Sequence, residues 1–175
     1  MKKIALLLLA SISFVSCDNQ IVQYPVSYSN DDFMQRSQER GKMLLQEEIQ
    51  WFDEYKKTSD LTFNKTESGL WISNNGQKTD NMARVGNYVN FTYQVYDVNG
   101  QTIYTYDEIG SHKIILGKAD IARGIHAALQ LIEPGQEARV LLPSFLGYAG
   151  YGDDNKIEPN QPLIMDIKVN EVKKH

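Results

Sequence analysis

The feature that most constrains this chain is the order of strand, turn and helix signals in its last third. Ile114-Ile115-Leu116-Gly117 reads as a strand that ends at a glycine turn, and the apolar residues between positions 121 and 129 predict a short helix. The loop 133–136 leads to a strand over 138–142, and a loop rich in Pro, Gly and Tyr leads to a last strand over 162–172. This order predicts an antiparallel sheet packed around one short helix.

Further strand signals lie upstream of this run. Apolar residues alternate with polar ones from Val89 to Val95, which is the period of a strand with one buried face. Asn99-Gly100 is a tight-turn dipeptide, and residues 61–84 read as a linking strand and loop. We therefore expect an α+β fold, in which a strongly twisted antiparallel sheet of five to six strands wraps on one short helix within residues 85–175.

Residues 31–60 predict an N-terminal amphipathic helix. Leu45, Ile49 and Phe52 fall at positions i, i+4 and i+7 and form an apolar stripe. Two interpretations stay open, because the stripe either docks the helix on the domain or pairs two copies of the chain as a homodimer through residues 31–57. Docking is favoured because the stripe is short and lacks sustained heptads.

The first residues predict export. Two lysines and an apolar run occupy residues 2–9, so residues 1–16 have the layout of a lipoprotein signal peptide, and the run is too short to span a bilayer. Cys17 falls where a bacterial lipobox places the residue that becomes diacylated, and the polar residues 17–30 would form a lipidated tether. We expect a lipid anchor in the cell envelope, on the outer membrane or the periplasmic face. A plain secreted protein is the alternative.

Composition and charge exclude several classes of partner and site. The formal charge is −4, and removal of the two signal-peptide lysines takes it to −6, which disfavours nucleic acid because phosphate binding needs clustered Lys and Arg. Membrane attachment would then depend on acyl chains at Cys17 rather than on a basic surface. The single cysteine excludes an intramolecular disulfide. His112, His126 and His175 have no ligand spacing, so we expect no metal and no cofactor.

Several short motifs follow one another in a characteristic order. They are Leu116-Gly117, Arg123-Gly124, Pro134-Gly135, Leu142-Pro143 and Pro159-Asn160. Together with the strand that begins at Val89, they give this part of the chain a resemblance to the FKBP-type peptidyl-prolyl cis-trans isomerases. The resemblance implies an FKBP-like fold for residues 85–175, isomerisation of Xaa-Pro bonds, and proline-containing exported polypeptides as partners.

The same resemblance implies the site residues. The catalytic hydroxyls fall on Tyr93 and Tyr148, while Ala122 would bind a ligand carbonyl through its backbone amide. Without the resemblance, a tyrosine on an alternating strand is more often a core residue. The implied substrate-binding positions are Ile103, Tyr104, His112, Ile121, Ala122, Ile125, Ile157 and Met165.

Three pocket positions depart from the family pattern. Ile103-Tyr104 stands where the family has Phe-Asp, Ile125 where it has a floor Trp, and His112 where it has a wall Phe. Each exchange removes aromatic surface that would grip a prolyl ring, so we expect a reduced activity. Asp107 follows the altered pair, and we do not assume that it replaces the missing acid.

The aspartates of the late loop have two interpretations. Asp153 and Asp154 most simply form a solvated turn, although they could order the loop that carries Tyr148.

A finer resemblance adds the segments Arg36-x-x-Glu39-Arg40 and Ser68-Gly69-Leu70-Trp71 to the lipobox. This combination resembles the FKBP-type lipoprotein associated with gliding motility in Bacteroidota, which implies a folding helper for envelope components. Two rival hypotheses stay open beside an active isomerase. One is a catalytically weak chaperone or binding module that uses the same pocket, and the other is a structural lipoprotein whose pocket is filled by its own side chains.

Overall fold

The computed structural model describes residues 30–74 and 79–174. The predicted signal peptide, Cys17 and the tether up to residue 29 lie outside the described residues. The chain divides into two units, Met1–Ser37 and Gln38–His175, and the sheet and candidate site belong to the second. Among the described residues, no helix combines the length and the apolar character that crossing a membrane would require.

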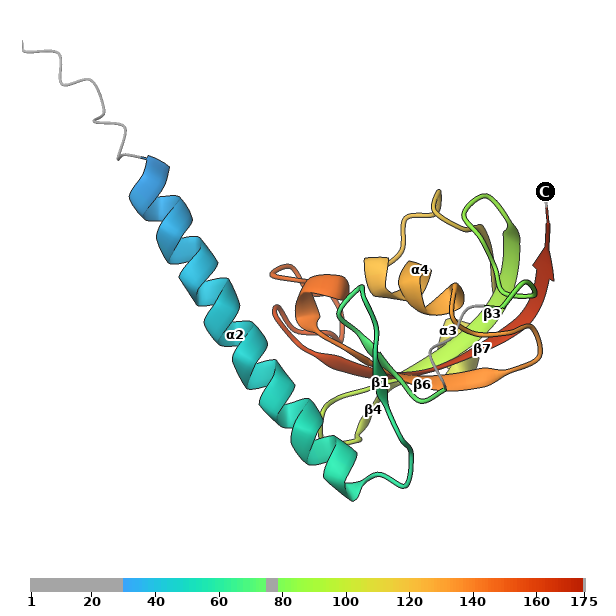
Figure 1. The fold of residues 1–175 in the computed structure, drawn as a ribbon, viewed down its shortest axis with the longest axis horizontal. Helices are drawn as coiled ribbons and strands as arrows, with labels where there is room; N and C mark the ends of the chain where they lie inside the picture. Colours follow the sequence, from blue (N-terminus) through green and yellow to red (C-terminus); the bar gives the residue numbers. More distant parts are fainter. Residues whose placement is uncertain (1–29, 75–78, 175) are drawn as a thin grey trace, which may run out of the picture. The chain divides into compact units, whose positions relative to one another are not determined.

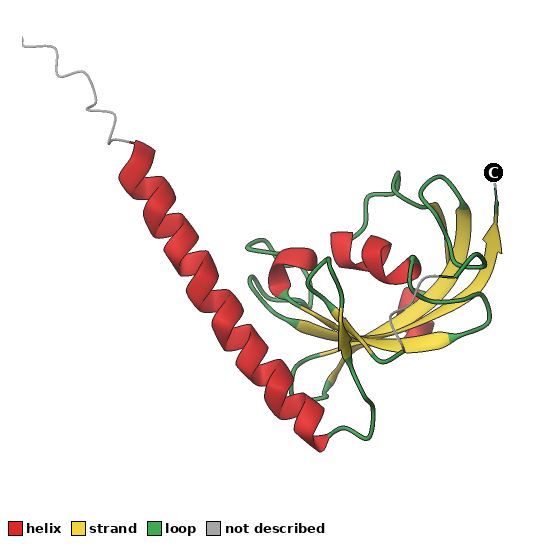
Figure 2. Ribbon diagram, in the orientation of Figure 1, coloured by secondary structure: helices red, strands yellow, loops and turns green. Residues whose placement is uncertain are grey.

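A seven-stranded sheet forms the centre of the second unit (Figures 1 and 2). Its strands are β1 (Asn64–Lys65), β2 (Trp71–Ile72), β3 (Tyr88–Tyr96), β4 (Thr102–Tyr104), β5 (His112–Ile115), β6 (Glu137–Leu142) and β7 (Leu163–Lys173). The order is β1-β2-β6-β7-β3-β4, β5 also pairs with β3, and every pairing is antiparallel. The predicted α+β fold is confirmed, and the two short strands β1 and β2 bring the sheet to seven.

Strand β3 organises the sheet because it pairs with β4, β5 and β7. Its residues Val89, Phe91, Tyr93 and Val95 are buried and alternate with more exposed ones, as the predicted period requires. Tyr93 lies opposite Ile167 on β7, and Val95 lies opposite Met165. The alternation gives the sheet one continuous apolar face.

Helix α4 (Arg123–Leu129) packs on this apolar face. Ile125 and Leu129 are almost fully buried there. Gly124 allows the close approach, since a Cβ at this position would lie 2.0 Å from Cδ1 of Leu142. The helix predicted from residue 121 begins at Arg123, because Ala122 has an extended backbone and serves as the N-cap.

The C-terminal half of helix α2 (Asn30–Thr58) packs on the other face of the sheet. Leu141 and Ile164 belong to this second cluster, and their sequence neighbours belong to the first, so the two clusters lie on opposite faces. Phe52 is fully buried, and its ring centroid lies 5.4 Å from that of Trp71. The apolar stripe of the helix therefore docks on the domain.

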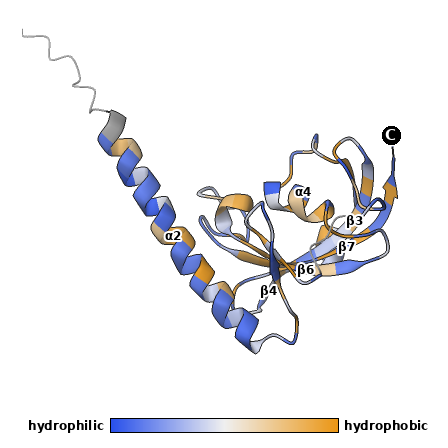
Figure 3. Ribbon diagram, in the orientation of Figure 1, coloured by the Kyte–Doolittle hydropathy of each residue, from blue (hydrophilic) through white to orange (hydrophobic). Residues whose placement is uncertain are grey.

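Polar residues occupy much of α2 between its apolar positions (Figure 3). Trp51, next to the buried Phe52, is 43% exposed, and Met43 is also exposed. Docking therefore leaves some apolar side chains of this helix uncovered.

Two short helices were not predicted from the sequence. The first, α3 (Tyr106–Ile109), begins with a capping box in which Thr105 and Glu108 bond each other's backbone N–H. The pattern Thr-x-x-Glu is the sequence signal that identifies it. The second is the 3-10 helix η1 (Ser144–Leu146), which lies in the loop before Tyr148.

Candidate functional site

Aromatic rings form one wall of the candidate site. Tyr93 projects from β3 and is 8% exposed. Its ring centroid lies 5.8 Å from that of Phe91 and 5.4 Å from that of His112. His112 also stacks on Phe91, with a centroid distance of 5.4 Å. Two predicted site residues, Tyr93 and His112, thus share one wall.

Tyr148 reaches this wall from the loop after η1. The hydroxyl groups of Tyr93 and Tyr148 lie close enough to affect each other's pKa, so the two predicted catalytic residues meet. Burial raises the pKa of Tyr93, and the interaction with Tyr148 raises it further. Burial also raises the pKa of Tyr148, the charge of Asp153 adds to the rise, and the interaction with Tyr93 opposes it. Because Tyr148 stays neutral, its own proton can be donated to a substrate carbonyl.

Apolar side chains close the floor of the site. Ile125 comes from α4, Ile157 from the loop before β7, and Met165 from β7, and none of them is more than 4% exposed. The other predicted binding residues pack against this core while partly exposed: Ile103, Tyr104, Ile121 and Ala122. The structure therefore brings the predicted residues together, but a prolyl ring would meet the rim residues before the floor.

The rim of the site contains a carboxylate that sequence reasoning did not place. The Tyr104 hydroxyl donates to Oδ2 of Asp153 at 2.6 Å, and Nδ2 of Asn155 donates to the Tyr104 hydroxyl at 2.9 Å. Lys156 lies 4.7 Å from the Tyr104 ring centroid. Residue 104 is thus a tyrosine whose hydroxyl binds an acid from the opposite loop, and Asp107 is an exposed residue of α3.

Asp153 also orders the backbone of its own loop. Its Oδ1 accepts hydrogen bonds from the N–H of Asn155 at 3.0 Å and of Ile157 at 2.8 Å. Burial opposes ionisation, but the bonds from Tyr104 and the backbone hold the pKa of Asp153 below its ordinary value. Of the two interpretations of this aspartate, the structure shows the one in which it orders the loop.

The ring of His112 has one nitrogen without a partner. Its Nε2 is buried and makes no hydrogen bond within the described part of the chain. Burying a polar atom in this way is unfavourable. The histidine that stands here in place of the family's phenylalanine therefore destabilises the wall without adding a hydrogen bond through Nε2.

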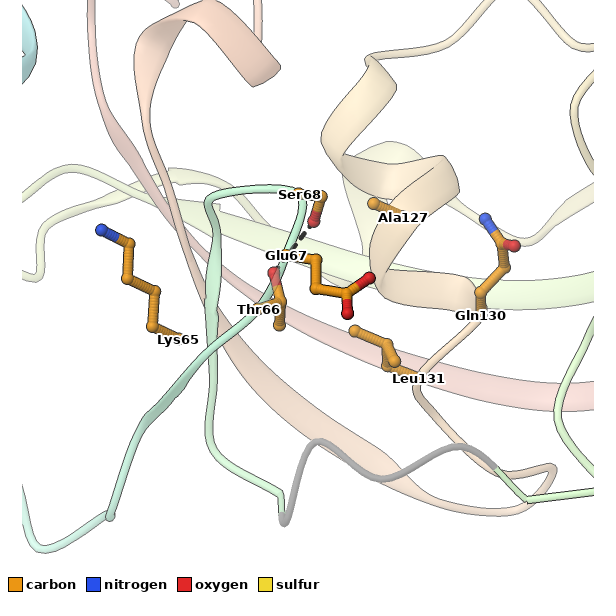
Figure 4. Close-up of a pocket in the computed structure, with 7 residues that line it drawn as sticks. All are labelled: Lys65, Thr66, Glu67, Ser68, Ala127, Gln130 and Leu131. Atoms are coloured by element: carbon orange, nitrogen blue, oxygen red, sulfur yellow. Dashed lines mark hydrogen bonds between the residues drawn. The ribbon is translucent and has the colours of Figure 1, made fainter.

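A separate cavity lies away from the tyrosines. It has a volume of about 420 Å³ and lies between the segment Lys65–Ser68 and the end of α4, where Gln130 and Leu131 border it (Figure 4). Its lining is a mixture of polar and apolar groups and includes none of the predicted site residues. No group of three or more His, Cys, Asp or Glu side chains suited to a metal ion occurs among residues 30–74 and 79–174.

The site is equipped for chemistry that needs no nucleophile. Rotation about an Xaa-Pro bond breaks amide resonance and crosses a barrier of about 18–20 kcal/mol. The twisted amide has less charge separation than the planar one, so an apolar surface favours it relative to the ground state. A hydroxyl donor at Tyr148 beside an apolar floor supplies both requirements.

Comparisons with known proteins agree with this geometry. The family model described as FKBP-type peptidyl-prolyl cis-trans isomerase matches residues 79–170. A peptidyl-prolyl cis-trans isomerase from Pseudomonas syringae pv. tomato superposes with a TM-score of 0.60 at 19% identity, covering 76% of this chain and 96% of that one. FkpA from Escherichia coli gives a TM-score of 0.59 at 19% identity, covering 99% of this chain and 83% of that one. At such identities the two structures show a shared fold, and no curated protein matches the sequence.

Proposed function

This chain belongs to the family of FKBP-type peptidyl-prolyl cis-trans isomerases, and we propose that it isomerises Xaa-Pro bonds of polypeptides exported to the cell envelope. The observation that carries the proposal is that Tyr93, Tyr148 and the floor residues pack together in one apolar cluster. Exported polypeptides are the expected clients because residues 1–16 read as a signal peptide.

In the proposed mechanism, Tyr148 is the residue that touches the substrate. Its hydroxyl donates to the carbonyl next to the proline, while Tyr93 lies beside that hydroxyl. Ala122 lies at the N-cap of α4, where the backbone N–H is outside the helical hydrogen-bond ladder and can bind a second carbonyl. Fixing the two carbonyls leaves the prolyl bond as the part that rotates.

The altered pocket supports a modest rate. Ile125 and Met165 are closed to solvent, and the partly exposed aromatic rings near the site are those of Tyr104 and Tyr148. Less aromatic surface gives a weaker grip on a prolyl ring. The same observation favours the second candidate function, a chaperone-like module that binds proline-containing segments with little catalysis.

We further propose a lipid-anchored location. Acyl chains on Cys17 would hold the protein on the outer membrane or the periplasmic face, and residues 17–30 would act as the tether. The sequence resemblance adds components of the gliding machinery as a client class. The exposed side chains of Met43 and Trp51 support a homodimer through residues 31–57.

The test is exchange spectroscopy by NMR on Xaa-Pro peptides with the mature protein. Catalysed exchange is expected to rise in proportion to protein concentration and to fall about tenfold in Tyr148→Phe, which loses the donor but keeps the ring. Tyr151→Phe is the matched control, because Tyr151 lies in the same loop and is 86% exposed. Ile125→Trp is expected to raise the rate by restoring an aromatic floor.

The outcomes separate the candidates. Peptide binding without acceleration of exchange would identify a binding module, and the absence of both would contradict the proposed function. An equal loss in Tyr148→Phe and Tyr151→Phe would show that the hydroxyl of Tyr148 has no special role.

A further inference from the structure

A buried carboxylate of helix α2 contacts the loop that carries Tyr148. Glu48 is 1% exposed, although glutamate is rarely buried so deeply. Its Oε2 accepts a hydrogen bond from the backbone N–H of Ser144 at 3.0 Å, and its Oε1 accepts one from the Ser144 hydroxyl. A residue 96 positions earlier in the chain therefore caps the first residue of η1.

Ser144 also forms hydrogen bonds with the residues on both sides of Tyr148. Its carbonyl oxygen accepts hydrogen bonds from the N–H of Gly147 at 3.0 Å and of Ala149 at 2.8 Å. The carbonyl of Ala149 in turn accepts from the N–H of Asn160 at 2.5 Å. The backbone before and after Tyr148 is thus bonded to the serine that Glu48 holds.

The conformation at Ala149 explains why such support is required. Its φ is +49°, in the left-handed region that residues other than glycine seldom adopt. A strained residue of this kind persists only where its surroundings hold it, and strain of this type is typical of functional loops. The bond from the Ala149 N–H to Ser144 is one of the contacts that hold it.

Stability alone does not account for the glutamate. Burial raises the pKa of Glu48, and the two bonds from Ser144 only partly oppose the rise. A carboxyl whose pKa is higher in the folded state than in the unfolded state lowers stability above the folded pKa, and this cost disappears as the pH falls through that value. Above the folded pKa, the charged form of Glu48 therefore lowers the stability of the fold.

We infer that Glu48 is a positioning residue that fixes the Tyr148 hydroxyl in the isomerase site through Ser144. The inference rests on the proposed function, since it assigns Glu48 to the alignment of the same hydroxyl donor. It also gives helix α2 a part in catalysis in addition to its docking on the sheet.

The test compares Glu48→Gln and Glu48→Leu with Glu47→Leu. Glutamine keeps an oxygen that can accept from the Ser144 N–H, leucine keeps the size but accepts nothing, and Glu47 is an exposed neighbour on the same helix. Glu48→Leu is expected to lower kcat/KM for peptide exchange about tenfold or more, Glu48→Gln is expected to recover most of it, and Glu47→Leu is expected to match the parent. Thermal unfolding of each variant checks that it is folded.

A double-mutant cycle with Tyr148→Phe shows whether the effect passes through the tyrosine. If Glu48 acts by aligning the hydroxyl, Glu48→Leu lowers the rate by less than about twofold once that hydroxyl is absent. Independent, multiplicative losses would overturn the inference, as would a folded Glu48→Leu variant with the parent kcat/KM.

Hydrogen exchange provides a readout that does not depend on activity. The amides of Gly147 and Ala149 are expected to exchange faster in Glu48→Leu than in the parent and in Glu47→Leu, because the serine that accepts their bonds has lost its anchor. Unchanged protection would overturn the inference even if the protein proved to be a binding module. A parent protein without catalysis, but with this loss of protection in Glu48→Leu, would refute the proposed isomerase function while leaving the positioning contact intact.

Discussion

Hydroxyl groups and one carboxylate hold the rim of the site together at the residue scale. Tyr104 binds Asp153, Tyr93 lies beside Tyr148, and the charge of Asp153 raises the pKa of both Tyr93 and Tyr148. An acid that the family pattern places at position 104 is thus replaced by a phenol that binds an acid from another loop. The substitution keeps a negative charge near the two tyrosines.

Asp153 should make the order of this loop depend on acid. Because its pKa is lower in the folded state than the ordinary 3.8, its contribution to stability is complete above 3.8 and is lost as the pH falls through the lower folded value. Urea unfolding of the parent and Asp153→Asn is expected to show a constant difference in the free energy of unfolding from neutral pH down to about 4, then a shrinking one. Asp154→Asn, at the exposed neighbouring position, should show no such difference.

His112→Phe should stabilise the fold. The substitution removes a buried nitrogen that has no partner and keeps the stacking on Phe91 and Tyr93, so we expect the free energy of unfolding to rise by about 1 kcal/mol. In the matched control, His126→Phe, both ring nitrogens have partners in the parent, at Gly117 and Ala119, and stability should fall by about 1–3 kcal/mol. A loss of stability in His112→Phe would contradict this expectation.

The loop between η1 and β7, residues 147–162, behaves as one structural element. Its shape depends on Gly152, whose φ is +70° and whose hypothetical Cβ would lie 2.3 Å from the carbonyl oxygen of Ile157. The neighbouring Asp153 then bonds the backbone of Ile157 in both directions, through its N–H and through its side chain. This turn places Ile157 under the site and Asp153 at its rim.

Gly152→Ala should therefore displace the backbone of this loop. The clash is with backbone, so the loop must shift, and we expect a loss of about 1–3 kcal/mol in the free energy of unfolding together with a lower rate of peptide exchange. Gly150→Ala is the control in the same loop, because its Cβ would meet nothing closer than Oδ1 of Asn160 at 3.7 Å. If both variants kept the parent stability and rate, the turn at Gly152 would not determine the site.

At the scale of the whole molecule, the chain combines an acidic surface with a predicted lipid anchor. Because the formal charge is −4, an anionic membrane does not attract the chain electrostatically. Attachment would have to come from acyl chains, and two or more chains are needed for stable anchoring.

Metabolic labelling with a fatty acid tests the anchor. The parent is expected to carry the label and to leave the membrane fraction with detergent but not with high salt, while Cys17→Ser is expected to carry no label because the chain has no other cysteine. A soluble, unlabelled parent protein would support the alternative of plain secretion.

The sequence by itself determined the order of elements and the domain in which the predicted site residues lie. Period-2 alternation identified β3, the order of strand and turn signals identified the terminal strand, apolar spacing identified α4, and motif order placed Tyr93 and Tyr148 on one domain. These signals are local, or depend on a fixed order along the chain, because strand and helix periods follow from backbone geometry. The two short helices and the pair β1 and β2 are less visible, since elements of two to four residues have no period to detect.

Only the tertiary structure decided which side chains meet across the loops. The bonds from Tyr104 to Asp153 and from Ser144 to Glu48 join residues 49 and 96 positions apart. No local pattern marks such partners, because an aspartate in a polar loop and a glutamate on an amphipathic helix are equally typical of solvated positions. Burial turns them into specific partners, since a carboxylate taken out of water must find donors, and the fold determines which donors are within reach.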